Sequence, residues 1–368
     1  MSEIPSAVEI VEGSTRVLVP KQHTLKGPGK RLGGVFYNQQ TAFSRDVSVM
    51  FFGALKFEGK ALDGLAGTGV RAVRIANESP GDFEFIINDR SKEAFEYIKR
   101  NIDLNGLENC IPCHSDVRIL LCEQTFDYID IDPFGSPVPF VQLGIEGCKR
   151  RGILGITATD TAPLAGTYPD KCLRRYGAKP FRCAFGHEIG LRILIGYLAR
   201  EAAKFERGIK PVLCFYADHY FRVHIQLLEG AQYADQSLRT LGSIGYDENS
   251  KERKFPATDD LEQIGPLWLG RLFDKELLVR MIPYDFLHCK NRCAKYLKIW
   301  KEELDELPYF YDVDEISSIL KISPPPLNDI LEELRKSGKA SRTHFSPRGF
   351  KTDLTLKEVL ERVEEIAK

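Results

Sequence analysis

The sequence predicts an α/β protein with a doubly wound, mostly parallel sheet, followed by a smaller C-terminal α+β domain. Between residues 61 and 228, short apolar runs typical of strands alternate with helix patterns. Four of these strands end at or near an aspartate, which is where open parallel sheets present residues to a ligand. The composition changes after about residue 240, and helix patterns dominate from Pro266 onward. We therefore expect two domains, residues 1–262 and 263–368.

The individual elements are expected in the following order. Residues 1–60 read as irregular structure that leads into a helix near Arg45 to Leu55. Ser91 precedes a helix pattern and is a suitable N-cap. The polar stretch 247–265 reads as a surface connection. The expected strands are 61–63, 83–89, 110–114, 126–131, 152–158, 211–217 and 221–228, and the expected helices in this region are 70–77, 91–105 and 188–206.

The C-terminal part has a recognisable order of patterns. Residues 312–320 and 324–337 read as two helices joined by a turn, and 338–354 reads as a basic hairpin. This order resembles a winged helix, a module that contacts nucleic acids or proteins. A plain helical packing domain is the alternative.

Composition and charge limit the class of protein. The chain has 368 residues, 43% hydrophobic and 28% charged, with a net charge of −1, as in ordinary soluble proteins. No apolar run reaches the roughly 18–20 residues that span a bilayer, and Met1 to Pro5 lacks the start of a secretory signal. Nine cysteines at irregular spacings suit the reducing cytosol. We expect a cytoplasmic protein without membrane segments, and a monomer.

A metal site is the alternative use of the cysteines. Cys110 and Cys113, with His114 beside them, have the spacing of half a zinc site. Structural zinc needs four ligands, and the other close pair, Cys289 and Cys293, is distant and differently spaced. We expect no metal.

Basic residues are concentrated in two segments. No acidic residue occurs from Gly13 to Arg45, and none from Lys171 to Arg182. Clusters of this kind with aromatic residues between them fit a phosphate-rich partner. The alternative is a solvated surface balanced by acids elsewhere. The cations of the first segment are Arg16, Lys21, Lys26, Lys30, Arg31 and Arg45.

A glycine motif marks a nucleotide pocket. Gly67-x-Gly69-x-x-Ala72 fits the dinucleotide fingerprint, with Asp89 at the distance of a ribose-binding acid, so a dehydrogenase has to be considered. However, acids are expected at four successive strand ends, and they would repel a pyrophosphate. They would attract S-adenosylmethionine, which carries a sulfonium and an ammonium. This favours methyl transfer, with the acids Asp63, Asp89, Asp116 and Asp132 around one crevice.

Asp132-Pro133-Phe134-Gly135 is the most informative motif. It follows the apolar strand pattern 126–131, so it is expected at the carboxyl end of a strand. The carboxylate of Asp132 can accept hydrogen bonds from an exocyclic amino group, and the ring of Phe134 can stack on the base that carries that group. The pair suits methyl transfer to a nucleobase nitrogen.

Longer stretches resemble one family, the tRNA guanosine-26 N2,N2-dimethyltransferases. The most specific are 131–137 (IDPFGSP) and 157–166 (TATDTAPLAG), and the similarity extends from about residue 13 to 280. Many relatives carry two Cys-x-x-Cys pairs between about residue 241 and Gly265, where this chain has no cysteine. Gln39 and Ser44 also replace an expected Pro and Asn, which affects only local loop detail. The other matching stretches are 35–38, 44–46, 63–71 and 265–270.

This resemblance implies a class I methyltransferase fold of the Rossmann-like type, with S-adenosylmethionine as donor and the exocyclic amine of a tRNA guanine as acceptor. Asp89 would hold the ribose hydroxyls, and Asp116 would accept from the adenine amino group. Residues 263–368 would form an accessory domain that binds tRNA. The implied cofactor residues are Arg45, Arg71, Asp89, Asp116 and the backbone of Val117, which join Asp63 and Gly67 of the glycine pocket.

For the acceptor, we predict the following mechanism as a hypothesis. Phe134 and Phe36 would sandwich a guanine that has left its stack, and Asp132 with the carbonyl of Pro133 would accept its N2 hydrogens. Two alternatives remain. One is an amino-directed methyltransferase acting on rRNA guanine or DNA adenine, and the other is a DNA-docking regulator that only senses the cofactor.

Overall fold

The computed structural model describes residues 7–25 and 34–367, which form two compact units. Of the described residues, the first unit contains 7–25, 34–158, 224–227 and 275–297, and the second contains 159–223, 228–274 and 298–367. Both units are built from separate segments of the chain. This division by packing differs from the expected division at residue 262, whose functional assignment stays a prediction.

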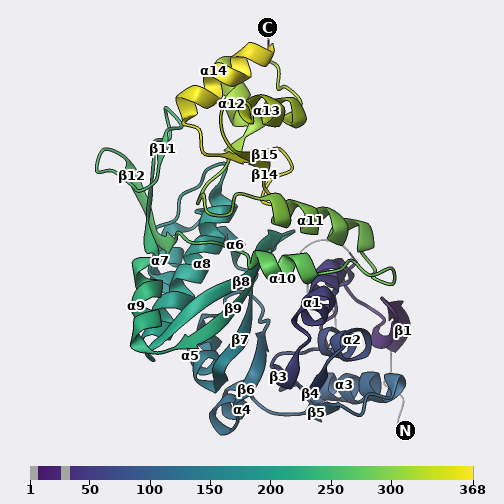
Figure 1. The fold of residues 1–368 in the computed structure, drawn as a ribbon. Helices are drawn as coiled ribbons and strands as arrows, with labels where there is room; N and C mark the ends of the chain where they lie inside the picture. The colour runs from purple at the N-terminus through teal and green to yellow at the C-terminus, as the bar shows by residue number, and fades with distance from the viewer. Residues whose placement is uncertain (1–6, 26–33, 368) are drawn as a thin grey trace. The chain divides into compact units, whose positions relative to one another are not determined.

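The first unit is built on a parallel sheet (Figure 1). Its strands are ordered β5-β4-β3-β6-β7, and every adjacent pair is parallel. Strand β3 lies between β4 and β6, so successive strands are added first on one side of β3 (β4, β5) and then on the other (β6, β7). This order confirms the doubly wound α/β fold. The complete order is β5-β4-β3-β6-β7-β9-β8. The strands are β3 (Glu58–Asp63), β4 (Asp82–Asn88), β5 (Cys110–Cys113), β6 (Phe126–Ile131), β7 (Cys148–Ala158), β8 (Arg207–Ala217) and β9 (Tyr220–Glu229).

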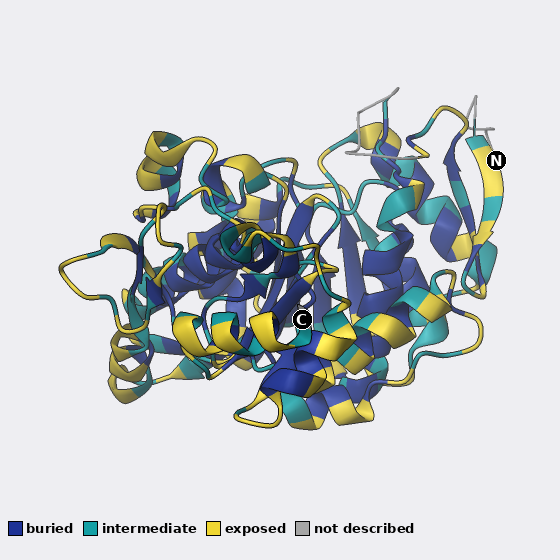
Figure 2. Ribbon diagram, turned by 90° about the horizontal axis from the view of Figure 1, so that it is seen from above, coloured by how far each residue is buried: buried dark blue, intermediate teal, exposed yellow. Residues whose placement is uncertain are grey.

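Helices cover both faces of this sheet. Side chains alternate between the two faces of a strand, so Tyr128 and Ile131 of β6 face opposite ways. The ring of Tyr128 packs edge-on against Phe52 of α1, at 4.7 Å between centroids, whereas Ile131 lies close to Gly144 of α5. The strands between these helices are accordingly mostly buried (Figure 2). The helices are α1 (Ala42–Leu55), α2 (Val70–Glu78), α3 (Lys92–Asn105), α4 (Val117–Glu123), α5 (Val138–Gly147), α10 (Lys275–Arg280) and α11 (Lys290–Glu302).

Residues 7–20 form a β-hairpin, so the expected irregular start is wrong for this segment. Strands β1 (Ala7–Glu12) and β2 (Thr15–Pro20) pair in antiparallel register. The fully buried Asn101 of α3 fastens the hairpin: its Oδ1 accepts from Leu18 N at 2.6 Å, and its Nδ2 donates to Leu18 O at 3.1 Å and to Thr68 O at 2.8 Å. Lys26, Lys30 and Arg31 of the basic segment lie outside the described residues, as do Met1 to Pro5.

The second unit contains a three-stranded antiparallel sheet ordered β11-β10-β12. The expected surface connection 247–265 is therefore wrong in part, because it contains β11 and the start of β12. The interior Gly265-Pro266 pair looks like a strand breaker in the sequence. The elements are α6 (Thr161–Leu164), α7 (Pro169–Tyr176), α8 (Gly186–Ala203), α9 (Ala231–Arg239), β10 (Leu241–Tyr246), β11 (Arg253–Lys254) and β12 (Glu262–Trp268).

The C-terminal segment of the second unit has its own small core. Ile316, Ile330 and Phe350 are completely buried in it. Two helices are followed by a hairpin, in the order expected from the sequence; the role of a winged helix stays a prediction. The elements are β13 (Tyr311–Asp312), α12 (Val313–Leu320), α13 (Leu327–Leu334), β14 (Ala340–Arg342), β15 (Gly349–Thr352) and α14 (Leu356–Ala367).

Within 7–25 and 34–367, no helix combines the length and apolar character needed to cross a membrane. The same residues contain no group of three or more His, Cys, Asp or Glu side chains that could hold a metal ion.

Replacing Asn101 with alanine should lower the free energy of unfolding by about 2–3 kcal/mol, because it leaves several buried backbone groups without partners. Asn105→Ala is the matched control. Asn105 makes similar bonds to the backbone of Arg16, at 3.2 and 2.7 Å, but in an exposed position where water can replace them. Urea unfolding should show a clearly smaller loss for Asn105→Ala, and equal losses would contradict the proposed role of burial.

Candidate active site

Four acidic residues gather at one edge of the sheet because the strands are parallel and in register. Asp63 of β3 pairs with Ile87 of β4 and with Asp130 of β6. Asp63, Ile87 and Asp130 therefore lie at one level of the sheet, and Asp89 and Asp132 each follow this level by two residues. Asn88 pairs with Cys113 of β5, which brings Asp116 to the same edge. The structure thus brings together the four strand-end acids expected from the sequence.

The turn after β3 is held by the carboxylate of Asp89. Its Oδ2 accepts from Gly67 N at 2.9 Å, and its Oδ1 accepts from Ser91 N at 2.8 Å. Gly67 has a positive φ of 56°, and a Cβ at this position would lie 3.2 Å from the carbonyl oxygen of Phe36. Both the conformation and the close approach favour glycine, as the glycine motif predicts.

Asn88, which the sequence analysis missed, joins the loops that follow two strands. Its buried amide donates to the carbonyls of Gly64 at 2.9 Å and Ser115 at 3.1 Å, and its Oδ1 accepts from Ser115 N at 3.0 Å. An asparagine directly before Asp89 at a strand end was the available signal. Asn88 fixes the relative positions of the loops that carry Asp63 and Asp116.

Asp116 is the N-cap of α4, a helix not expected from the sequence, and Val117 is its first residue. The Oδ1 of Asp116 accepts from Arg118 N at 2.9 Å, and the Arg118 guanidinium also contacts both carboxylate oxygens. These hydrogen bonds from Arg118 lower the pKa of Asp116 to about 2. As the first helical residue, Val117 has an N–H without an acceptor inside the helix.

Asp132 follows β6 and forms an ion pair with Arg71 of α2. Arg71 Nη2 lies 2.5 Å from Asp132 Oδ2, and their side chains are 10% and 30% exposed, respectively. The other end of the guanidinium donates to Ser44 Oγ at 3.2 Å and to Ser48 Oγ at 3.0 Å in α1. Ser44, a departure from the family pattern, is thus a contact of Arg71. The structure brings together an expected cofactor residue and the expected acceptor-binding acid.

These arginines correct the electrostatic argument made from the sequence. Two of the four acids, Asp132 and Asp116, are paired with Arg71 and Arg118. The expectation of four uncompensated carboxylates is therefore wrong. The net negative charge of these carboxylates is not a reason to prefer a cationic cofactor over a pyrophosphate. What remains is the donor and acceptor geometry of the individual side chains.

Phe36 and Phe134 contact each other at this site. Their ring centroids are 4.8 Å apart at an interplanar angle of 85°. A base between two parallel rings needs about 7 Å, twice the roughly 3.5 Å contact distance of carbon atoms. The sandwich expected from the sequence is not present in this arrangement and requires one ring to turn. Phe134 is 63% exposed.

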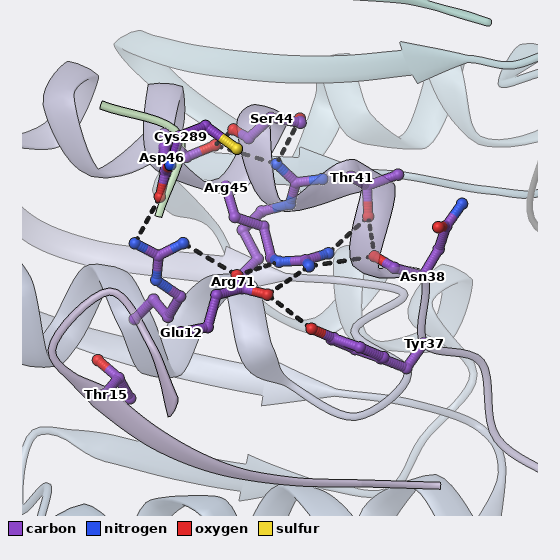
Figure 3. A network of polar contacts seen from close by, with 12 residues as sticks. Glu12, Thr15, Tyr37, Asn38, Thr41, Ser44, Arg45, Asp46, Arg71 and Cys289 are labelled. Atoms are coloured by element: carbon purple, nitrogen blue, oxygen red, sulfur yellow. Dashed lines mark hydrogen bonds and ion pairs between the residues drawn. The ribbon is translucent and has the colours of Figure 1, made fainter. Parts of the chain in front are cut away.

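Arg45 belongs to a buried network around Glu12 (Figure 3). Arg45 Nε and Nη2 donate to the two carboxylate oxygens of Glu12, both at 2.6 Å. Tyr37 donates its hydroxyl to Glu12 at 2.7 Å, and Arg74 Nη1 donates at 2.9 Å. Burial of Glu12 opposes ionisation, but Arg45 and Arg74 outweigh it and lower the pKa to about 2. The described contacts of Arg45 are structural; its role toward a cofactor stays a prediction.

The residues present fit an adenosine-containing cofactor. Asp89 lies beside the glycine turn, and Asp116 with the Val117 N–H offers an acceptor next to a donor, the pattern that an adenine edge matches. Asp63 is buried at 2% exposure at the end of β3.

The chain is similar to known proteins of one family of tRNA methyltransferases. The family model described as N2,N2-dimethylguanosine tRNA methyltransferase matches residues 13–364. The tRNA (guanine(26)-N(2))-dimethyltransferase of Pyrococcus abyssi is 40% identical, over 94% of this chain and 96% of the relative. The enzyme of the same name from Saccharolobus islandicus is 37% identical, over 97% and 99%. The structure of Trm1 from Pyrococcus horikoshii in complex with S-adenosyl-L-methionine is similar with a TM-score of 0.88 and 38% identity, over 96% and 99%.

Replacing Glu12 with glutamine should destabilise the protein by about 3 kcal/mol or more, because it leaves the buried Arg45 without its countercharge and removes one of the carboxylates around Arg74. Glu9→Gln is the control. Glu9 pairs with Arg16 at 2.8 Å on the same hairpin, with side chains 40% and 56% exposed, and such a pair contributes at most about 1 kcal/mol.

The difference between wild type and Glu12→Gln should depend on pH with a defined sign. The pKa of Glu12 is lowered in the folded state from 4.5 to about 2, so its contribution is complete above about pH 4.5. The contribution should decline as the pH falls toward 2. Urea unfolding of both proteins across this range measures it, and a difference that grows on acidification would contradict the assignment.

Proposed function

This chain belongs to the N2,N2-dimethylguanosine tRNA methyltransferase family, and on that basis we propose how its residues perform the reaction. The protein is an S-adenosylmethionine-dependent tRNA (guanine(26)-N(2))-dimethyltransferase: it methylates the exocyclic N2 of guanine 26 to N2-methyl- and N2,N2-dimethylguanosine. The resemblance read from the sequence is confirmed. The dehydrogenase and the DNA-docking regulator are set aside, and no observation favours rRNA or DNA as substrate.

The observation that carries the mechanism is Asp132 at the carboxyl end of β6, held by Arg71 through one oxygen. S-adenosylmethionine supplies an electrophilic methyl group on a positively charged sulfur. We assign the ribose hydroxyls to Asp89, the adenine amino group to Asp116, and an adenine ring nitrogen to the Val117 N–H. The remaining proposed contacts to the cofactor are Arg45, Asp63, Gly67 and Arg71.

Asp132 acts on the acceptor as an orienting and charge-stabilising group. The Arg71 bond uses Oδ2, so Oδ1 and the carbonyl oxygen of Pro133 are the groups that accept the two N2 hydrogens of guanine. These bonds hold the amine in one orientation. They also stabilise the positive charge that develops on the nitrogen as it is methylated. As N2 takes the methyl group it releases one proton to Asp132 Oδ1, from which solvent removes it. A single N–H then remains, so the second transfer relies on one of the two acceptors.

Phe134 supplies the stacking surface. Its exposed ring can cover the face of a guanine that has left its stack, an interaction worth roughly 1–3 kcal/mol per base. In this proposal Phe36 packs against the other side of the pocket.

We also propose the setting of the enzyme. All nine cysteines are free thiols, which is consistent with a cytoplasmic location. We propose a monomer in which residues 1–262 bind the cofactor and the target base and residues 263–368 bind tRNA. Mass spectrometry of nucleosides from tRNA incubated with protein and donor tests the activity. A tRNA with adenine in place of guanine 26 should accept no methyl groups; equal incorporation would point to another base.

Asp132→Ala should reduce the rate of methylation at saturating tRNA and donor by about two orders of magnitude or more, because an electrostatic stabiliser is lost. Asp132→Asn keeps an acceptor oxygen but not the charge, and should fall between this variant and wild type. Asp103→Asn, an exposed acid on α3, is the control and should keep full activity. Unchanged turnover of Asp132→Ala would remove Asp132 from the mechanism.

Asp89→Ala should raise the dissociation constant for S-adenosylmethionine by about tenfold or more, as expected for losing hydrogen bonds to a charged acceptor. The loss has two sources: the ribose contact, and the support of Gly67 N and Ser91 N. Isothermal titration calorimetry measures the constant, with Asp103→Asn again as control. Unaltered affinity would show that Asp89 does not face the cofactor.

A further inference from the structure

We propose that the pocket formed by Tyr168, Lys171 and Arg174 binds a nucleotide of the tRNA outside the target guanine, with the ring stacking on a base and the two cations contacting phosphates. The pocket has a volume of about 380 Å³ and lies at the start of α7, in the second unit. This inference rests on the proposed function, since it takes tRNA as the substrate. The lining residues are Thr167, Tyr168, Pro169, Asp170, Lys171 and Arg174.

The helix beneath the pocket is firmly anchored. Cys172 and Tyr176 of α7 are completely buried. The hydroxyl of Tyr176 donates to Asp160 at 2.8 Å, and Arg175 Nη1 contacts the same carboxylate at 2.8 Å. Arg200 of α8 donates to the carbonyl of Tyr176. Side chains on the outer face of α7 therefore project from a fixed base.

That outer face carries groups without protein partners. The side chains of Tyr168, Lys171 and Arg174 make no hydrogen bond, ion pair or ring contact with any described residue. Nearby cations differ, since Arg175 is paired with Asp160 and Lys179 with Glu262 at 2.9 Å. Tyr168 is 57% exposed.

The chemistry of the pocket matches RNA. Lys171 and Arg174 lie three residues apart on one side of α7. Tyr168, directly before the helix, lines the same pocket. The single acid in the lining, Asp170, leaves the pocket with a net positive charge, and the run from Lys171 to Arg182 contains no acid. A stacking ring beside cations that track a backbone is the usual combination for unpaired nucleotides.

The test measures binding of a tRNA transcript whose guanine 26 is replaced by adenine, at several salt concentrations. Lys171→Glu and Arg174→Glu should each weaken binding roughly tenfold and lower the slope of log K against log salt by about one. Tyr168→Ala should weaken binding roughly tenfold without changing the slope, because stacking releases no counterions. Affinity for S-adenosylmethionine should stay the same in all three variants.

Two control variants match these changes. Leu173→Ala truncates a side chain that is also 57% exposed and lies on the same helix. Arg239→Glu reverses a charge whose side chain is 80% exposed on α9. Neither should alter tRNA affinity. If Leu173→Ala weakens binding as much as Tyr168→Ala does, the effect is a disturbance of α7 and the inference falls.

Two further results would overturn the assignment. The first is tRNA affinity that stays within about twofold of wild type in all three variants. The second is adenosine monophosphate binding that depends on Tyr168 while tRNA binding does not, which would assign the pocket to a free nucleotide. A wild-type protein that yields no dimethylguanosine would instead overturn the proposed function, so the two failures are distinguishable.

Discussion

The parallel register of β3, β4 and β6 is the constraint on which the site depends. It sets Asp63 level with Ile87 and Asp130, so that the residues just beyond them emerge at one edge. Adjacent residues on a strand face opposite ways. At the end of β4, Asn88 is therefore buried and joins two loops, while its neighbour Asp89 supports the glycine turn. A slip of one residue would exchange a buried amide with a carboxylate and dismantle both functions.

The ion pair between Arg71 and Asp132 connects the residues expected at the cofactor with those expected at the acceptor base. Arg71 belongs to the helix that follows the glycine turn, and Asp132 belongs to the motif expected to grip the acceptor base. Because Ser44 and Ser48 hold the far end of the guanidinium, the position of Asp132 is coupled to α1 as well. A carboxylate already paired with arginine is better suited to orient an amine than to act as an isolated negative charge.

The parts predictable from the sequence were those with local signals. Strand 126–131 and the N-cap Ser91 follow directly from an apolar run and a capping residue, and both are confirmed. The hairpin 7–20 was missed although alternating β-branched residues flank the two-residue turn Gly13-Ser14, a strong hairpin signal. Helix α4 was missed although Ser115-Asp116 is a suitable cap for it.

The same distinction holds for the site: features with a local sequence signal were predictable, and contacts between distant residues were not. The four acids could be placed because each follows a strand pattern. The charge balance at the site could not be predicted, because the side chains that provide it are brought together only by folding. Arg71 meets Asp132 across 61 residues of sequence, and Arg45 and Arg74 meet Glu12 across 33 and 62. No periodicity encodes such pairings, whereas the cap formed by Asp116 with Arg118 spans two residues. The buried network was therefore beyond the reach of pattern analysis.

The network around Glu12 also determines which aromatic ring can move to admit a base. Tyr37 and Arg45 are both fixed on Glu12, and the carbonyl of the preceding residue, Phe36, lies close to the glycine turn at Gly67. The backbone of Phe36 is thus restrained by Tyr37 and by the close approach of its own carbonyl to Gly67. Phe134 is largely exposed, and nothing lies within 4 Å of the position that a Cβ on Gly135 would take. In the proposed mechanism, opening the edge-to-face pair for a guanine is therefore a movement of Phe134, and Phe36 is the stationary wall of the pocket.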